Sequence, residues 1–370
     1  MSQPIKRLES LDILRGFDLF LLVALQPILM QLGKVWDAPA YHALLYQFEH
    51  ESWEGFRLWD LIMPLFLFMT GITIPFSMDS KIGVANKKIY KQLLRRFIIL
   101  WVLGMVIQGN LLAFDWQQLK LYSNTLQAIA TGYLFTALMY MHLSYRAMIG
   151  VSMALLIIYA LPFHFLQDYS FHHNFAMQMD KKVLGSFMDG VKYDESGVWS
   201  YSEWYHYTWI WSSLTFVVTV SMGCFAGRWI KRYSEYPSKV MKYLIYSGVL
   251  CLITSLLWSI DLPIIKKIWT SSMTLFSGGI CFLLMALFYY IIDIKRQVKW
   301  FRWLKIFGMN SIVAYFIGQF INFSSVVHSI TYGLESQFQT YTNLIVIIGN
   351  IALVVLILYI MYKQRWFIKI

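Results

Sequence analysis

The chain has 370 residues, of which 58% are hydrophobic and only 14% are charged. Average soluble domains carry about 25% charged residues, so the composition excludes an ordinary soluble protein and indicates a polytopic membrane protein. The formal net charge of +11 would favour a nucleic-acid partner on a soluble chain. Here, however, the lysines and arginines are distributed according to the loops between apolar runs.

Ten apolar runs approach or exceed the roughly 20 residues that cross a bilayer as a helix. They cover residues 17–32, 58–76, 97–114, 125–141, 147–165, 209–226, 243–260, 273–292, 307–323 and 344–361. We therefore predict an all-α fold, a membrane helix bundle of about ten transmembrane helices. We treat residues 1–370 as one transmembrane domain, with the longest polar stretch, 167–207, as an extracytoplasmic loop.

The basic residues predict the orientation of this bundle. With ten spans and the N-terminus in the cytoplasm, 23 lysines and arginines fall on inside segments and 8 on outside segments. This is a strong positive-inside bias, so we expect both termini in the cytoplasm, and the net charge gives no support for nucleic-acid binding. The N-terminus lacks the pattern of a cleavable signal peptide, so we expect the first span to direct insertion.

The first span begins with an unusual charged pattern, LDILRGFDLFLL. Asp12, Arg15 and Asp18 are three residues apart, and side chains at that spacing are neighbours on a helix. A structural ion pair with a snorkelling Arg15 and the lining of a polar cavity are equally open interpretations. Near the outer end of the same span, Gln26 and Pro27 predict a polar break.

The stretch 48–71, FEHESWEGFRLWDLIMPLFLFMTG, places titratable groups just before the second span. His50 lies between two glutamates, and histidine suits proton transfer near neutral pH. An exposed loop histidine is the more common alternative from spacing alone. Asp60 follows Arg57 by three residues and either closes the helix as an ion pair or serves a site. Pro64 cannot donate a backbone hydrogen bond, so it predicts a bend.

Polar residues also occur at the ends of other spans. Each of them alone is more often a helix–helix contact than a site, but together they predict a polar interior; they are Asn110, Asp115, Ser123, Asn124, Thr125, Gln127, Asn310, Ser311 and Tyr315. The sequence contains no Walker loop or His–Glu metal motif and no nucleophile elbow. Cys224, Cys251 and Cys281 lie inside predicted spans, and their spacing predicts neither a disulfide nor a metal site.

Several motifs give the chain a family resemblance. RLESLDILRGFDLFLL is followed by HESWEGFRLWDLIMPLFLFMTGITI, and further matches are TLQAIATGY, SSLTFVVTVSMGCFAGRWIK, KKIWTSSMTLFSGGICFLLMALFYYIID and FGMNSIVAY. In this order they resemble the transmembrane acyltransferases related to heparan-α-glucosaminide N-acetyltransferase, whose bacterial branch is often described as a domain of unknown function. The resemblance covers nearly the whole chain, and the pattern H-x-x-W-x-G-x-x-x-x-D-L-x-x-P-x-F-x-F-x-x-G is its most specific part.

The resemblance implies an N-acetyltransferase of the bacterial cytoplasmic (inner) membrane, with no metal. Such an enzyme uses acetyl-CoA from the cytoplasm as co-substrate and acetylates an amino sugar or glycan on the extracytoplasmic side, directly or through an acetylated histidine. The active histidine of the family falls on His50. The family's asparagine in the first core span falls on Gln26, which is one methylene longer, and the arginine of an L-Q-R motif falls on Ala128.

The chemistry of these residues agrees with that assignment. A neutral His50 can accept a proton from the amine or attack the thioester, and an amide N–H of Gln26 can stabilise the oxyanion; Asp60 completes the expected catalytic set. The basic inner surface would attract the polyanionic CoA. We expect Asp12, Arg15 and Asp18 at the cytoplasmic mouth of its slot, and Asn310 in the same cavity.

Two other functions remain open from the sequence. Buried acidic and basic residues with helix-breaking prolines also suit a transporter for a small solute or sugar. The departures at Gln26 and Ala128 suit a catalytically degenerate membrane scaffold. Besides the lipid bilayer, the exposed apolar surface permits a homodimer as a partner arrangement.

Overall fold

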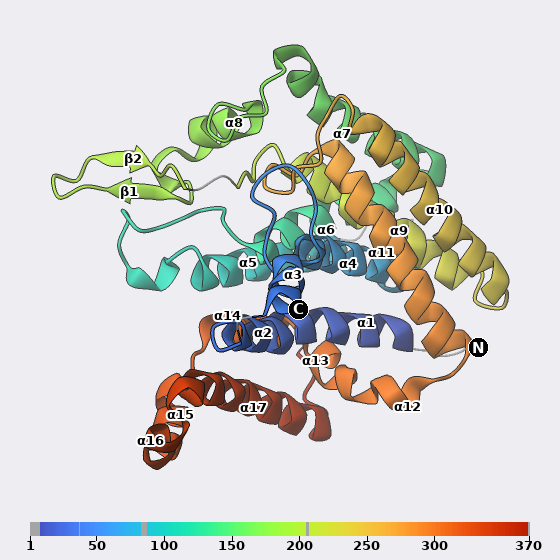
Figure 1. Cartoon of the computed structure of the whole chain (residues 1–370). Helices are drawn as coiled ribbons and strands as arrows, with labels where there is room; N and C mark the ends of the chain where they lie inside the picture. Colours follow the sequence, from blue (N-terminus) through green and yellow to red (C-terminus); the bar gives the residue numbers. More distant parts are fainter. Residues whose placement is uncertain (1–7, 37, 83–86, 205–206, 369–370) are drawn as a thin grey trace. The chain divides into compact units, whose positions relative to one another are not determined.

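The computed structural model describes residues 8–36, 38–82, 87–204 and 207–368, most of which form α-helices (Figure 1). This confirms the all-α fold class. The chain divides into two compact units. The terminal unit consists of Met1–His50, Arg57–Ile62 and Leu287–Lys369, and the central unit consists of Glu51–Phe56 and Met63–Ala286.

Among the described residues, seven helices are long and apolar enough to cross a membrane. They are Glu9–Leu32, Leu58–Lys81, Tyr145–Leu166, Ser213–Arg232, Pro237–Trp258, Ser271–Ile294 and Gln339–Lys363. The pair Ser311–Phe320 and Ser324–Thr331, bent by 69°, makes an eighth if it counts as one broken span. Helices also cover most of the predicted runs at 97–114 and 125–141, but these helices fall outside the set, so the candidate spans number seven or eight and the expected ten stays a prediction.

The first half of the terminal unit is nearly continuous helix. It contains α1 (Glu9–Phe20), the π-helical segment η1 (Leu21–Leu25), α2 (Gln26–Leu32), α3 (Pro39–Gln47) and the 3₁₀ turn η2 (Leu58–Leu61). The polar break expected at Gln26 therefore takes the form of a π-helical segment directly before it. Such segments are rare and frequent at functional sites.

The second half of the terminal unit consists of shorter pieces and one long helix. These are η6 (Tyr289–Ile294), α12 (Val298–Phe301), η7 (Arg302–Leu304), α13 (Lys305–Met309), α14 (Ser311–Phe320), α15 (Ser324–Thr331), η8 (Tyr332–Leu334), α16 (Glu335–Phe338), η9 (Gln339–Tyr341) and α17 (Thr342–Lys363). A Cβ added to Gly16 would lie 1.9 Å from the Leu304 carbonyl oxygen, and one added to Gly308 would lie 1.9 Å from that of Asp12. The backbones of α1 and α13 therefore touch, as small residues allow in membrane helices.

The central unit holds the remaining helices. They are α4 (Ile62–Met78), η3 (Asp79–Lys81), α5 (Lys87–Ile107), η4 (Leu111–Ala113), α6 (Thr125–His142), α7 (Tyr145–Leu166), α8 (Phe175–Leu184), η5 (Gly185–Phe187), α9 (Ser213–Arg232), α10 (Pro237–Trp258) and α11 (Ser271–Phe288). Helix α9 is almost wholly buried and contacts α6, α7 and α10. Leu250 and Leu257 on α10 are exposed, as expected for a helix that faces lipid. None of the three cysteines is in a disulfide.

The polar stretch 167–207 is folded, apart from residues 205–206, which lie outside the described part. It contains α8 and an antiparallel hairpin of β1 (Val191–Tyr193) and β2 (Trp199–Tyr201), with Lys192 paired to Ser200. The carboxylate of Asp194 accepts hydrogen bonds from the backbone N–H groups of Ser196 and Val198, both at 2.9 Å. An aspartate commonly closes a turn in this way, so the Asp-Glu-Ser-Gly sequence sets the turn of the hairpin.

Candidate functional site

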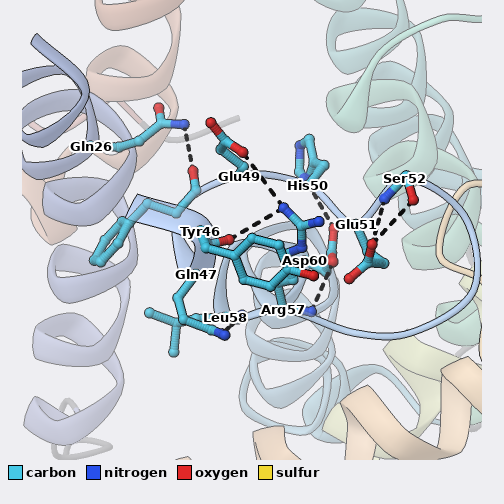
Figure 2. Close-up of polar contacts among 11 residues, drawn as sticks. Gln26, Tyr46, Gln47, Glu49, His50, Glu51, Ser52, Arg57, Leu58 and Asp60 are labelled. Atoms are coloured by element: carbon cyan, nitrogen blue, oxygen red, sulfur yellow. Dashed lines mark hydrogen bonds and ion pairs between the residues drawn. The ribbon is translucent and has the colours of Figure 1, made fainter. Parts of the chain in front are cut away.

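The structure brings together two of the predicted catalytic residues. Nδ1 of His50 lies 2.8 Å from Oδ1 of Asp60, although ten residues separate them (Figure 2). An ionised carboxylate can only accept hydrogen bonds, so a neutral His50 paired with ionised Asp60 would carry its proton on Nδ1, with Nε2 as the unprotonated nitrogen. In this tautomer, Nε2 can accept a proton or attack an electrophile.

Asp60 is held rigidly by its own turn. Arg57 has an extended backbone and precedes η2, and its N–H donates to Oδ2 of Asp60 at 3.0 Å. This is the N3 contact of a capping box, in which the carboxylate of the third helical residue accepts a hydrogen bond from the backbone N–H of the N-cap residue. The side chain of Asp60 is 1% exposed and that of His50 is 39% exposed. A buried acid therefore orients an imidazole that reaches solvent.

Pro64 does not bend the second span. The α-helical part of that span starts at Ile62, so Pro64 lies in its first turn. The N–H groups of the first turn have no partner within the helix, and proline is tolerated there. The expected bend at Pro64 is wrong for this reason, and the change from 3₁₀ turn to α-helix occurs just before it.

The two glutamates beside His50 are engaged with other groups. Oε2 of Glu49 lies 3.6 Å from the Arg57 guanidinium, which also stacks 3.5 Å from the ring centre of Tyr46. Oε1 of Glu51 accepts a hydrogen bond from the Ser52 N–H at 2.8 Å. The residue that orients the imidazole is thus Asp60, ten positions away, and the neighbours in sequence serve the loop.

The side chain of Gln26 contacts the backbone of the segment that carries His50. Its Nε2 donates to the carbonyl oxygen of Phe48 at 3.0 Å, two residues before His50 (Figure 2). A second hydrogen bond joins α2 and α3, because the hydroxyl of Tyr41 donates to the Leu29 carbonyl at 2.8 Å. The Gln26 bond uses one of the two N–H donors of the amide and ties Gln26 to the segment that carries His50; the oxyanion role of Gln26 stays a prediction.

The residues expected around CoA are distributed along the terminal unit. Asp12 and Asp18 are buried in α1, and no described residue forms a hydrogen bond with either carboxylate oxygen of Asp18. The amide of Asn310 is engaged with the C-terminal tail: Nδ2 donates to the Trp366 carbonyl at 3.0 Å, and Oδ1 accepts from the Ile368 N–H at 3.2 Å. Phosphates are recognised by cations. Of these four residues only Arg15 is a cation, so their predicted place at the mouth of a CoA slot stays a prediction that rests on one charge.

The polar residues at the start of the fourth predicted span form a helix cap. Oε1 of Gln127 accepts from the N–H groups of Ser123 at 2.9 Å and Asn124 at 3.1 Å, and Nε2 donates to the Leu121 carbonyl at 2.7 Å. The Asn124 side chain accepts from the Leu126 N–H. Asn-x-x-Gln resembles the capping-box signal of a helix N-terminus, so the sequence itself could have shown that a helix begins at these residues. Ala128 follows them and is buried in α6.

A second histidine–aspartate pair, which was not predicted from the sequence, lies in the central unit. Nδ1 of His164 lies 2.9 Å from Oδ1 of Asp261, which joins the end of α7 to the loop after α10. The two side chains are 56% and 40% exposed. The interaction energy of an exposed ion pair is small, because water screens the charges. This pair therefore resembles the His50 pair in distance but differs from it in burial.

The described residues contain no group of three histidine, cysteine, aspartate or glutamate side chains that could hold a metal ion. Comparison with models of known protein families gives no match for this chain, and comparison with curated proteins gives none either.

Proposed function

We propose that the protein is a membrane-embedded acyltransferase that moves an acetyl group from cytosolic acetyl-CoA to an amino sugar or glycan on the extracytoplasmic side. The observation that carries the proposal is the 2.8 Å contact between Nδ1 of His50 and the buried carboxylate of Asp60. A buried carboxylate that holds an imidazole in one tautomer is the arrangement by which acyl-transfer enzymes prepare a base or nucleophile. The family resemblance of the motif from His50 to Gly71 supports the same reaction.

The proposed chemistry uses Nε2 of His50. In direct transfer, the amine of the acceptor attacks the thioester carbonyl, Nε2 accepts the proton that the amine loses, and the C–S bond breaks to release the CoA thiolate. That proton then neutralises the thiolate. In the stepwise alternative, Nε2 attacks the thioester carbonyl and the C–S bond breaks to release the CoA thiolate. The amine then attacks the acetyl carbonyl, the bond from that carbon to Nε2 breaks, and the proton that the amine loses passes to Nε2. Asp60 stabilises the positive imidazole ring in both routes.

Orientation and location belong to this proposal. The positive-inside bias of the loops, counted for ten spans, favours both termini in the cytoplasm, and the resemblance favours the bacterial cytoplasmic membrane. His50 precedes the second span and therefore lies near the extracytoplasmic face, where the acceptor would bind. The basic cytoplasmic loops would attract acetyl-CoA.

The direct test follows label from acetyl-CoA into a glucosamine-terminated acceptor in membranes that contain the protein. His50→Ala should abolish transfer, and Asp60→Asn should reduce it by about 10²-fold or more, as expected for loss of an oriented acid–base group. The matched control is His164→Ala, which removes a histidine with the same type of partner at nearly the same distance. This control should keep wild-type transfer.

Two results would overturn the proposal. Transfer that survives unchanged in His50→Ala would remove this histidine from the reaction. Equal losses in His50→Ala and His164→Ala would show that the assay reports protein integrity and not the chemistry of one imidazole. The amount of folded protein in each membrane preparation, measured by size-exclusion chromatography in detergent, separates these cases.

A transporter for a small solute or sugar is the second candidate. The observation in its favour is the bent helix pair Ser311–Phe320 and Ser324–Thr331, with an angle of 69°, because broken helices form binding sites in many transporters. Uptake of a labelled amino sugar into proteoliposomes without acetyl-CoA would favour this function over acyl transfer.

A further inference from the structure

Asp18 is the most unusual ionisable group in the first span. It is the tenth residue of the 24-residue span Glu9–Leu32, which places it about 13 Å along the helix axis from Glu9. This depth is well inside the roughly 30 Å hydrocarbon layer. The residue is fully buried, and both of its carboxylate oxygens lack a hydrogen-bond partner among the described residues.

The protonation state of such a group follows from its surroundings. An isolated carboxylate anion in a low-dielectric interior is far more costly than the neutral acid, and a buried group therefore takes up a proton unless a cation pairs with it. The charged groups of α1 itself are Glu9, Asp12 and Arg15. Glu9 is paired with Lys305 of α13 at 2.7 Å.

The segments packed against α1 contribute few other charges. Contacts of α1 are with η1, η6, η7, α13 and α14. Their charged residues are Asp293 in η6, Arg302 in η7 and Lys305 in α13. Asp293 is itself a carboxyl group with one buried oxygen that lacks a hydrogen-bond partner among the described residues. Neither these two basic residues nor Arg15 of α1 forms a hydrogen bond with either carboxylate oxygen of Asp18, so a proton remains the simplest way to neutralise the group.

The helix changes geometry directly after Asp18. The N–H of Leu21 is shared between the carbonyl oxygens of Asp18 and Phe17, and the next five residues form the π-helical segment η1. A π segment is a place where the hydrogen-bond register of a helix can shift. A shift there would turn Asp18 relative to its surroundings without breaking the span.

We propose that Asp18 is a proton-binding site inside the membrane: its carboxyl group holds a proton in the resting protein and gives it up only when a rearrangement at η1 admits water. In that step the O–H bond of the acid breaks, the proton passes to water and the carboxylate remains. Intramembrane acids commonly serve proton transfer. The inference does not depend on the acyltransferase proposal, and it replaces the expected role of Asp18 in CoA binding.

Infrared spectroscopy of the protein in lipid vesicles tests this directly, because a protonated carboxyl group has a carbonyl stretch that an ionised one lacks. The spectrum of the wild type at neutral pH should contain one such band that is absent in Asp18→Asn. The band should remain in Asp60→Asn, in Asp293→Asn and in Asp180→Asn, which removes the buried carboxyl group of α8 that also binds a proton near neutral pH; together these variants assign the band to Asp18. It should also persist in mildly alkaline buffer, where exposed acids are ionised.

Two results would overturn the proposal. One is a wild-type spectrum that differs from the Asp18→Asn spectrum only in the carboxylate stretch, which would mean that Asp18 is ionised. The other is a band that appears only when sodium is removed, which means that a metal cation holds the site. Asp18→Glu covers the case in which Asp18→Asn does not fold, because it should keep a protonated band at a shifted frequency.

A second readout uses chemical labelling of the wild-type protein. A hydrophobic carbodiimide reacts with protonated carboxyl groups: the acid oxygen bonds to the carbodiimide carbon, and the acid proton moves to its nitrogen. Mass spectrometry should find this adduct on the peptide that contains Asp18. Labelling confined to other peptides would contradict the proposal.

Discussion

The side-chain amide of Gln26 donates a hydrogen bond to the carbonyl oxygen of Phe48, 3.0 Å away and 22 residues along the chain. This contact joins the first span to the segment that carries His50. It suggests that Gln26 positions this segment, whereas the family resemblance predicts an oxyanion donor, and the two roles predict different mutant behaviour.

Gln26→Ala should reduce acetyl transfer by about two- to tenfold, because a single hydrogen bond contributes about 0.5–1.5 kcal/mol. Loss of an oxyanion donor would cost about 10²–10³-fold in kcat. Steady-state kinetics of acetyl transfer distinguish these ranges. Gln26→Asn keeps the amide but shortens the reach, so it should behave like Gln26→Ala, whereas full activity of Gln26→Asn would contradict the positioning role.

Gln127→Ala should destabilise the central unit without changing the substrate KM. The substitution leaves the N–H groups of Ser123 and Asn124 and the carbonyl of Leu121 without their partner. Buried groups that lose a partner cost about 1–3 kcal/mol each, so we expect a loss of about 2 kcal/mol or more. Thermal unfolding in detergent measures it, with the exposed Gln117→Ala as control. A raised KM at unchanged stability would instead favour a polar cavity at this position.

Asp180 should make the stability of the protein depend on pH. Burial raises the pKa of this carboxyl from 3.8 to about 7, and the N–H groups of Trp209 and Ile210 partly oppose the rise by donating to it. The folded state therefore binds a proton more tightly than the unfolded state. Stability should fall as pH rises from about 4 to about 7 and then level off, by up to about 4 kcal/mol.

Asp180→Asn should lack this component of the pH dependence. Unfolding temperatures of the wild type and the variant, measured across the same pH range, give the difference between them. From about pH 4 to about pH 7, the unfolding temperature of the wild type should fall relative to that of the variant. Parallel curves would show that Asp180 is not the titrating group.

A methyl group at Gly223 should disrupt the contact between α9 and α4. The added Cβ would lie 1.8 Å from the Phe68 carbonyl oxygen, which is backbone and cannot move aside easily. Forced overpacking costs about 1–3 kcal/mol and can cost more. The matched control is Gly150→Ala on α7, where no atom lies within 4 Å of the added carbon. Equal stability of the two variants in thermal unfolding would contradict the packing of α4 against α9.

The fold class could be predicted from the sequence, because a helix that lies in lipid needs a long apolar run whatever helices pack beside it. The sequence was less reliable for span count, since α5 and α6 are long helices that do not reach the apolar character of a candidate span. It also predicted His50 and Asp60 as single residues. Ten residues of sequence separate them, and no local pattern in the sequence encodes their pairing.

Sequence neighbours were misleading for the same reason. Glu49 and Glu51 flank His50, but their contacts are with Arg57 and Ser52, because successive side chains in a loop point in different directions. Asp12, Arg15 and Asp18 share a helical spacing, yet Asp18 has no described hydrogen-bond partner. Helical spacing brings side chains near one another, but burial and side-chain direction decide whether they pair.

The central claim is that acetyl passes from one side of the bilayer to an acceptor at His50 on the other. Purified protein in sealed vesicles tests it most directly, with labelled acetyl-CoA supplied only at the face that carries the termini and a glucosamine-terminated acceptor only at the opposite face. We predict label on the acceptor with wild-type protein and none with His50→Ala. Label that appears only when both substrates share one compartment, or that is the same with His50→Ala, would contradict the account.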